Sequence, residues 1–386
     1  MSTSALERCV GNAQRFLSDN WSQRPLLHGH EDEGSFDDLA SLGDFDHMVS
    51  SMFLRTPSFR MVKDGRTLPF PQYTKTARPT SGTIDGVANP AAIYDLFEKG
   101  ATLVLEGLHR YWRPLSRFCR ELEVELGHPV QVNAYITPPA SQGFAVHSDD
   151  HDVFVLQVYG DKQWQVYDLA YDAGDPTTTL IDDTLSTGCC LYIPKGFPHS
   201  ARTGEHASAH LTIGVLTHTP GTLLKEVVKL AEKEPLFQTP LPARLADDPD
   251  ALRQAIRDHL RELTQWIDKV DVDEVAARAA RVLATTRHEI VTGQLEQLLA
   301  LPRLGRDSVV RRRAGSVCLV VAMDDELAVL LADRELRMPL LTEGAMRFIR
   351  DREEFEVGEL DEHLDEAGSV VLVRRLIREG LLEADI

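Results

Sequence analysis

Between residues 130 and 215 the chain is a series of short apolar segments that end at glycine, proline or aspartate. Their length and their content of Val, Tyr and Phe predict β-strands rather than helices. Many short strands at this spacing are typical of a sandwich or a small barrel. The expected strands are Val130 to Thr137, Val153 to Tyr159, Lys162 to Tyr167 and Cys189 to Ile193, with a further strand after His210.

The sequence on either side of these strands has helical patterns. Residues 1 to about 90 are typical of short helices and irregular connections that lead into a core. After residue 92, apolar side chains at three- and four-residue spacing predict helix. A well-marked helix follows Asp248, which can cap it, and Pro249, which suits a first turn. Its apolar stripe is Leu252, Ile256, Leu260, Leu263 and Ile267.

The C-terminal part has a third pattern. The apolar segments from Val317 to Met323 and from Leu327 to Leu331 predict a hairpin. The apolar residues beyond them predict two or three short helices, a layout that resembles a winged-helix module. We therefore expect an α+β chain with a strand-rich domain at 1–218, whose barrel begins at about 92. A helical domain at 219–300 and a winged-helix-like domain at 301–386 follow it.

Composition limits the partners that we expect. No stretch of the 386 residues approaches the ~20 apolar residues of a membrane span, and the start lacks a signal-peptide pattern. We therefore expect a cytoplasmic protein with no membrane partner. The five scattered cysteines argue against a disulfide framework or a zinc knuckle. A net charge of −19 disfavours nucleic acid as a partner, even for a winged helix.

Two histidines and one carboxylate have the spacing of a metal site. On a strand, His147 and Asp149 would point to the same face. His199 follows a separate strand and a turn rich in proline and glycine, which would deliver it to the same barrel mouth. This ligand set can hold ferrous iron on one face and leave the opposite face open for a co-substrate and O2. We predict an Fe(II) site at these three residues.

Lys162 is expected to project into the same interior. Gly160-Asp161 is typical of a two-residue hairpin turn, which would pair Tyr159 with Lys162 on the inward face. A buried lysine without an acid partner is unfavourable, so its position favours an anionic ligand. The distal carboxylate of 2-oxoglutarate fits this role, since the other end of that molecule can chelate the metal.

Two stretches, Asn133 to Phe144 and His147 to Trp164, together resemble the JmjC-type cupin family of ribosomal oxygenases. Shorter stretches upstream, at Arg24 to Leu27, Leu54 to Arg60 and Ala101 to Leu105, extend the likeness. The resemblance implies a double-stranded β-helix (cupin jelly-roll) core, a helical dimerisation domain that makes a homodimer, and an acidic winged-helix domain. It also implies a hydroxylase that depends on Fe(II), 2-oxoglutarate and O2.

The resemblance also assigns roles to individual residues. It implies that His147, Asp149 and His199 are the catalytic iron ligands and that Lys162 holds the 2-oxoglutarate carboxylate, with Asn133 and Tyr135 as supporting pocket residues. Ser148 departs from the family, in which an aromatic residue is common, and this departure affects the substrate pocket rather than the iron. His151, His206 and His210 are expected to be spectators of the iron.

The expected function is hydroxylation of an arginine or histidine side chain of a protein, with a ribosomal protein favoured. The same chemistry on a natural-product precursor peptide, for example at a peptidyl histidine, or on a free amino acid is an alternative. A non-enzymatic alternative is a metal-binding cupin that regulates through its winged helix. Lysine demethylation uses the same fold and cofactors but fits this domain layout less well.

Overall fold

The computed structural model describes residues 3–29, 36–79, 82–141, 145–172, 178–288, 291–323 and 325–385. The chain divides into two compact units, Met1–Thr217 and His218–Ile386. The fold is mixed α and β, as the sequence predicts, with the larger sheets in the first unit. Within the described ranges, no helix has the length and apolar character needed to cross a membrane.

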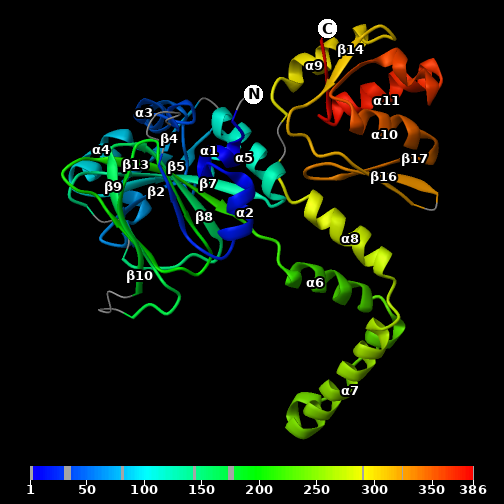
Figure 1. Cartoon of the computed structure of the whole chain (residues 1–386), viewed down its shortest axis with the longest axis horizontal. Helices are drawn as coiled ribbons and strands as arrows, with labels where there is room; N and C mark the ends of the chain where they lie inside the picture. Colours follow the sequence, from blue (N-terminus) through cyan, green and yellow to red (C-terminus); the bar gives the residue numbers. More distant parts are fainter. Residues whose placement is uncertain are drawn as a thin grey trace. The chain divides into compact units, whose positions relative to one another are not determined.

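The first unit is built on a large, mainly antiparallel sheet, which has eight strands among the described residues (Figure 1). Each expected strand from 130 onward is present, within a residue or two of its expected ends. The spatial order is β1 (Leu26–His28), β11 (Cys190–Ile193), β8 (Asp152–Tyr159), β13 (Ser208–Val215), β7 (Val130–Thr137), β6 (Thr102–Leu105), β2 (Phe59–Lys63) and β3 (Arg66–Thr67).

This sheet is covered on both faces, which explains the nearly continuous apolar sequence of β8. Phe154 and Leu156 pack into a core that includes residues of the N-terminal helices, whereas Val153 and Val155 face a second sheet. The helices over the first face include α1 (Ala5–Val10), α2 (Ala13–Asp19), α3 (Leu42–Ser51), α4 (Pro90–Glu98) and α5 (Arg113–Leu126). The helix expected after residue 92 is present as α4 and α5, with β6 between them, and α5 buries the side that includes Phe118.

The second sheet consists of β10 (Thr179–Ser186), β9 (Asp161–Tyr167) and β12 (His199–Arg202). Trp164 and Val166 of β9 join the core that Val153 and Val155 form on the larger sheet. The two sheets therefore pack face to face, and the inward residues of β7, β8, β9 and β13 enclose the space between them. A short pair, β4 (Thr74–Ala77) with β5 (Ile84–Ala88), lies outside both sheets.

The hairpin expected at Gly160-Asp161 is wrong, because β8 and β9 belong to different sheets. At Gly160 the chain passes from one sheet to the other through a left-handed conformation, with φ of 62°. A Cβ atom there would lie 2.1 Å from the carbonyl oxygen of Ala207. Only glycine fits this crossing, so the Gly-Asp pair marks a change of sheet rather than a two-residue turn.

The N-terminal segment also contributes more to the core than expected. Residues 1 to 90 were expected to hold only short helices and connections, yet β1 pairs with β11 and β2 pairs with β6. These edge strands extend the large sheet at both ends. Short strands of three to five residues carry too little sequence pattern to be recognised before the sheet is known.

The second unit begins with helices α6 (Pro220–Ala231), α7 (Pro249–Ile267), α8 (Val272–Ala284) and α9 (Gln294–Ala300). The expected start of α7 is confirmed: Asp248 accepts hydrogen bonds from the backbone N–H groups of Asp250 and Ala251, and Pro249 occupies the first turn. The apolar stripe of α7 is not packed into a core, since α7 has no buried residue among those described.

The remainder of the second unit has its own apolar core. The expected hairpin is present as β15 (Leu319–Ala322) and β16 (Glu326–Leu330), although Asp324 of its turn lies outside the described residues. The other elements are β14 (Val309–Arg312), β17 (Glu335–Pro339), α10 (Glu343–Asp351), β18 (Glu354–Glu356), α11 (Glu366–Arg378) and β19 (Leu382–Ala384). The boundary expected near residue 300 stays a prediction.

Candidate metal centre and co-substrate pocket

The structure brings His147, Asp149 and His199 together at one end of the space between the sheets. One ligand atom from each lies within 4.8 Å of the others, as a single metal ion requires. The Nε2 atom of His199 is 3.7 Å from Oδ2 of Asp149, and the two imidazole rings are 4.5 Å apart between centroids. Among the described residues, this is the one cluster of three such groups.

Backbone carbonyl groups fix which nitrogen of each imidazole faces the cluster. Nδ1 of His147 is 2.9 Å from the Ala145 oxygen, and Nδ1 of His199 is 3.0 Å from the Phe197 oxygen. A carbonyl can only accept, so Nδ1 carries the proton in both rings and Nε2 presents its lone pair. Burial lowers the pKa of the His199 imidazole, which also favours the neutral form that binds metals.

The expected strand at His147 and Asp149 is wrong, although the residues meet as predicted. His147 forms only an isolated bridge with His199, in which each backbone N–H donates to the other residue's carbonyl, at 3.1 and 2.8 Å. Asp149 lies in the connection that precedes β8, and its carbonyl accepts from the N–H of Gly196. The ligands are therefore positioned by backbone hydrogen bonds between the connection that precedes β8 and the turn and first residue of β12, rather than by strand alternation.

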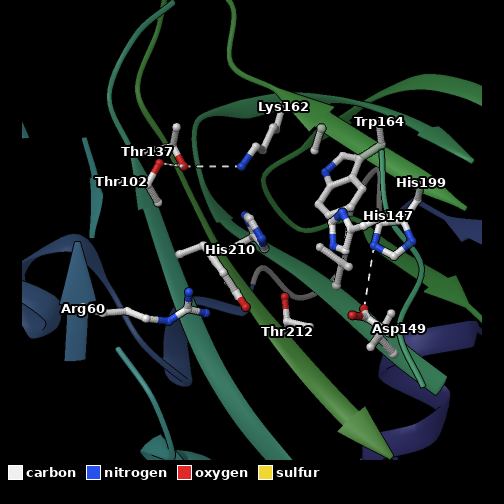
Figure 2. A pocket seen from close by; sticks show the side chains of 14 residues that line it. Arg60, Thr102, Thr137, His147, Asp149, Lys162, Trp164, His199, His210 and Thr212 are labelled. Carbon is white, nitrogen blue, oxygen red and sulfur yellow. Dashed lines mark hydrogen bonds and ion pairs between the residues drawn. The ribbon is translucent and has the colours of Figure 1, made fainter. Parts of the chain in front are cut away.

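Lys162 lies at the other end of the same cavity (Figure 2). Its side chain is 5% exposed, and its ammonium donates to Oγ1 of Thr137 at 3.3 Å. No carboxylate among the described residues pairs with it. Burial lowers the pKa of Lys162 to about 7, because the charged form is removed from water without compensation.

The cavity between these two ends has a volume of about 220 Å³. Figure 2 shows Lys162 and Thr137 at one end, Asp149 and His199 at the other, and His210 between them. The lining residues come from the inward positions of the surrounding strands and from the ligand loops: Arg60, Thr102, Tyr135, Thr137, His147, Asp149, Val153, Val155, Lys162, Trp164, His199, Ala201, His210 and Thr212.

The two supporting residues expected from the resemblance occupy different places. Tyr135 lines the cavity, and burial raises the pKa of its hydroxyl. Asn133 does not line it; its side chain accepts from the backbone N–H of Gly107 and hydrogen-bonds to Tyr135. Asn133 thus contacts the pocket through Tyr135, and its role in cofactor binding stays a prediction. Gln142 to Phe144, in the stretch that carried the resemblance, lie outside the described residues.

Several lining residues were given no role in metal or co-substrate binding by sequence reasoning. Arg60 reaches the cavity from β2 and is paired with Glu106, while His210 and Thr212 occupy alternate positions on β13. The alternation of His210 and Thr212 with the apolar Leu211 and Ile213 was a usable signal. Arg60 carried none, because its strand was not expected. Of the other two spectator histidines, His151 pairs with Asp150 and His206 lies at the surface.

The residues present fit a ferrous ion and a small diacid. Two neutral imidazoles and one carboxylate are a ligand set suited to Fe(II) with open positions. The orphaned ammonium of Lys162, buried at the far end of a small cavity, has the charge that a distal carboxylate would neutralise. A metal-chelating 2-oxo acid with a second carboxylate would satisfy both ends.

Comparisons with known proteins agree with this architecture. The model of the JmjC domain family matches residues 110–223, which include all three candidate ligands and Lys162. The chain carries a JmjC domain. The family resemblance seen in the sequence is therefore confirmed, and the face-to-face sheets are its cupin-like core.

Among similar proteins, ribosomal oxygenase 1 of Rattus norvegicus is 31% identical over 294 residues, which are 68% of this chain and 47% of that protein. The bifunctional lysine-specific demethylase and histidyl-hydroxylase NO66 of Drosophila persimilis is 29% identical over 239 residues, 58% of this chain and 33% of that protein. The JmjC-domain chain thus spans a third to a half of the length of these relatives.

The fold also matches solved structures. The Escherichia coli ribosomal oxygenase YcfD superposes with a TM-score of 0.56 and 18% identity, covering 98% of this chain and 99% of that one. A second YcfD structure, in complex with cobalt and 2-oxoglutarate, has a TM-score of 0.56 and 17% identity, covering 97% and 98%. At this identity the likeness concerns the fold.

Proposed function

We propose that this JmjC-domain protein is an Fe(II)- and 2-oxoglutarate-dependent oxygenase that hydroxylates an arginine or histidine side chain of a ribosomal protein. The observation that carries the proposal is the pairing of a three-residue metal cluster with an orphaned buried lysine across one small cavity. The names of the relatives, which include ribosomal oxygenases and a histidyl-hydroxylase, support the substrate class.

The residues of the chain have separable tasks in this reaction. His147, Asp149 and His199 would hold the metal, with the two imidazoles kept in the Nε2-ligating tautomer by Ala145 and Phe197. Lys162 and Thr137 would hold the distal carboxylate of 2-oxoglutarate and so set the direction of the molecule in the cavity.

The apolar lining around Val153 and Val155 would exclude water from the co-substrate. Bound Fe(II) and 2-oxoglutarate supply the oxidising chemistry, in which one oxygen atom of O2 enters a C–H bond and the other leaves in succinate, with release of carbon dioxide. The protein therefore contributes binding, orientation and exclusion of water, and needs no nucleophile of its own.

We propose further that the second unit supports this activity without chemistry of its own. Helix α7 exposes Ile256 and Leu260, which line an apolar groove together with residues of α6, and this surface suits a homodimer contact between two copies. The two small sheets and helices α10 and α11 suit a winged-helix domain. The overall negative charge favours a structural or protein-binding role for it over DNA binding.

The first test is the intact mass of every ribosomal protein from the source organism, with and without this gene. A protein lighter by one oxygen atom in the deletion strain is the expected result, and fragmentation of that protein would then identify the hydroxylated residue. Unchanged masses would refute a ribosomal substrate and favour a precursor peptide or a free amino acid.

A second test addresses the enzyme class independently of the substrate. The purified chain with Fe(II), ascorbate and 2-oxoglutarate should release carbon dioxide slowly even without the main substrate, and the Asp149→Ala variant should not. Binding of metal without any turnover would favour the non-enzymatic cupin.

A further inference from the structure

His210 lies in the cavity between Lys162 and the metal cluster and has one unsatisfied nitrogen (Figure 2). It lies on β13 at an inward position, is 3% exposed, and its Nδ1 atom is buried without a hydrogen-bond partner. A buried polar atom left in this state destabilises a folded protein, and such atoms are rare. His210 therefore needs a physical account beyond the spectator role expected from the sequence.

Aromatic neighbours hold the ring in a fixed orientation. The imidazole stacks on Tyr135, with centroids 5.1 Å apart and planes 7° from parallel, and meets Trp164 edge to face at 5.4 Å. These contacts explain the packing of the ring but supply no hydrogen-bond acceptor. Nε1 of Trp164, another residue that lines the cavity, can only donate and is also buried without a partner among the described residues.

The surroundings make a second positive charge at His210 unfavourable. Burial, and after it the charge of Lys162, lower the pKa of the imidazole well below its usual range. His210 is therefore neutral beside the Lys162 ammonium, and a neutral imidazole has one N–H to donate. The inner end of the cavity thus combines one cation with unsatisfied donor groups, a composition that matches a carboxylate rather than a neutral ligand.

We propose that His210 is a second binding residue for the distal carboxylate of the co-substrate, to which its Nδ1–H donates a hydrogen bond beside the Lys162 ammonium. This inference rests on the proposed function. It adds a determinant of co-substrate choice. The 2-oxo acid end of the co-substrate would bind the metal, whereas His210 and Lys162 together would bind the second carboxylate.

Two probes separate these contributions. 2-Oxoglutarate and 2-oxopentanoate share the 2-oxo acid end and the five-carbon chain, but only the former has the distal carboxylate. Their dissociation constants are measured by calorimetry on the full chain loaded with Mn(II), which holds the ligand without turnover. The ratio of the two constants measures recognition of the distal carboxylate alone.

The decisive variants form a matched pair. His210→Phe keeps the ring stack on Tyr135 but removes the N–H, and we expect the preference for 2-oxoglutarate to fall by about tenfold to a hundredfold, the usual range for a hydrogen bond to a charged group. His210→Asn removes the stack but places an amide nitrogen at the Nδ1 position, and should keep most of the preference. Affinity for 2-oxopentanoate should stay unchanged in both.

The opposite pattern would overturn the role of His210. If His210→Phe keeps the wild-type preference, or weakens both probes equally, the residue serves packing alone. Thermal melting and Mn(II) titration of each variant establish that the fold and the metal site are intact. If the wild-type chain itself binds both probes equally, the proposed co-substrate is wrong, and the proposed function fails with it.

Discussion

The cavity of the first unit and helix α7 of the second depart from ordinary protein packing in opposite ways. In the cavity, polar groups are buried without partners: the ammonium of Lys162 has only a hydroxyl, and Nδ1 of His210 has no hydrogen bond. On α7, apolar side chains are exposed without partners, as at Ile256 and Leu260, which are 51% and 56% exposed.

The unpaired polar groups and the exposed apolar side chains both lower the stability of the isolated chain. Each indicates the kind of partner that would restore this stability. Buried donors call for an acceptor with negative charge, which is a small acid. Exposed leucine and isoleucine on one helical face call for another apolar face, which is a protein surface. Buried polar groups without partners thus indicate a ligand site, whereas exposed apolar groups without partners indicate an interface.

The largest effect is expected at the metal cluster. Replacing Asp149 with alanine removes one of three ligands, so turnover measured as carbon dioxide release should be abolished. The neighbouring Asp150→Ala is the control, because that carboxylate is exposed and hydrogen-bonds to His151. An active Asp149→Ala enzyme would mean that the metal is bound elsewhere.

The next effect is expected at the far end of the cavity. Lys162→Ala should weaken 2-oxoglutarate binding by about 3–5 kcal/mol, or ~10²–10³ in affinity, because the carboxylate would be buried unpaired. Calorimetry on the Mn(II)-loaded chain measures this, with Lys195→Ala, an exposed lysine near the metal loop, as the control. Wild-type affinity in the Lys162 variant would contradict the pocket assignment.

On α7, a charge in the apolar groove should weaken self-association. Leu260→Lys is expected to cost about 2 kcal/mol or more of dimer stability, the range of an interface hot spot, because it would bury an unpaired charge in the contact. Analytical ultracentrifugation over a range of concentrations measures the effect. Leu299→Lys on α9 is the matched control, since this leucine is 82% exposed and lies outside the groove. If both variants dissociate equally, the groove is not the contact.

The last effect concerns stability without the co-substrate. Lys162→Met should raise the free energy of unfolding, and the difference from wild type should depend on pH. The pKa of Lys162 is about 7 in the folded chain against 10.5 in a free side chain. Below pH 7 Lys162 is protonated in the folded and the unfolded chain, and the full cost of burying its charge lowers the stability. Between pH 7 and 10.5 the unfolded chain binds more protons than the folded chain. The stability of the wild type therefore rises with pH relative to that of the variant.

Urea unfolding of both proteins at several pH values checks this sign. The advantage of the methionine variant should shrink by about 1.4 kcal/mol per pH unit between 7 and 10. An advantage that is independent of pH would mean that Lys162 stays charged in the folded chain up to about pH 10, so that burial does not lower its pKa.

The elements that sequence reasoning located well depend on local patterns. The strands from Val130 onward and the start of α7 follow from alternation, turn residues and a capping aspartate. Gly160 was misread because its left-handed conformation serves a hairpin and a change of sheet equally well. The close approach of the Ala207 carbonyl, which accompanies the change of sheet, comes from a residue that is distant in sequence.

The site shows the same division between local and distant information. His147, Asp149, His199 and Lys162 could be selected by residue type and spacing, and the structure gathers them around one cavity. Arg60 could not be weighed in this way, because its position in the cavity follows from how β2 joins the sheet. For His210 the alternation along β13 indicated a shared face with Thr212, but not that this face lines the cavity. Pairing across a sheet is not encoded in the spacing of any one segment.

The reciprocal hydrogen bonds between the backbones of His147 and His199 have a kinetic consequence. Two of the three ligand residues are tied together by backbone hydrogen bonds, and the backbone of Asp149 is held by Gly196 of the same turn, so an arriving ion meets a partly assembled site. Capture of the metal should then depend mainly on shedding its water ligands, and loss of one imidazole during release should be followed by rapid rebinding. The bridge between His147 and His199 should therefore slow the exchange of the bound ion, even though the Asp149 carboxylate remains partly exposed to solvent.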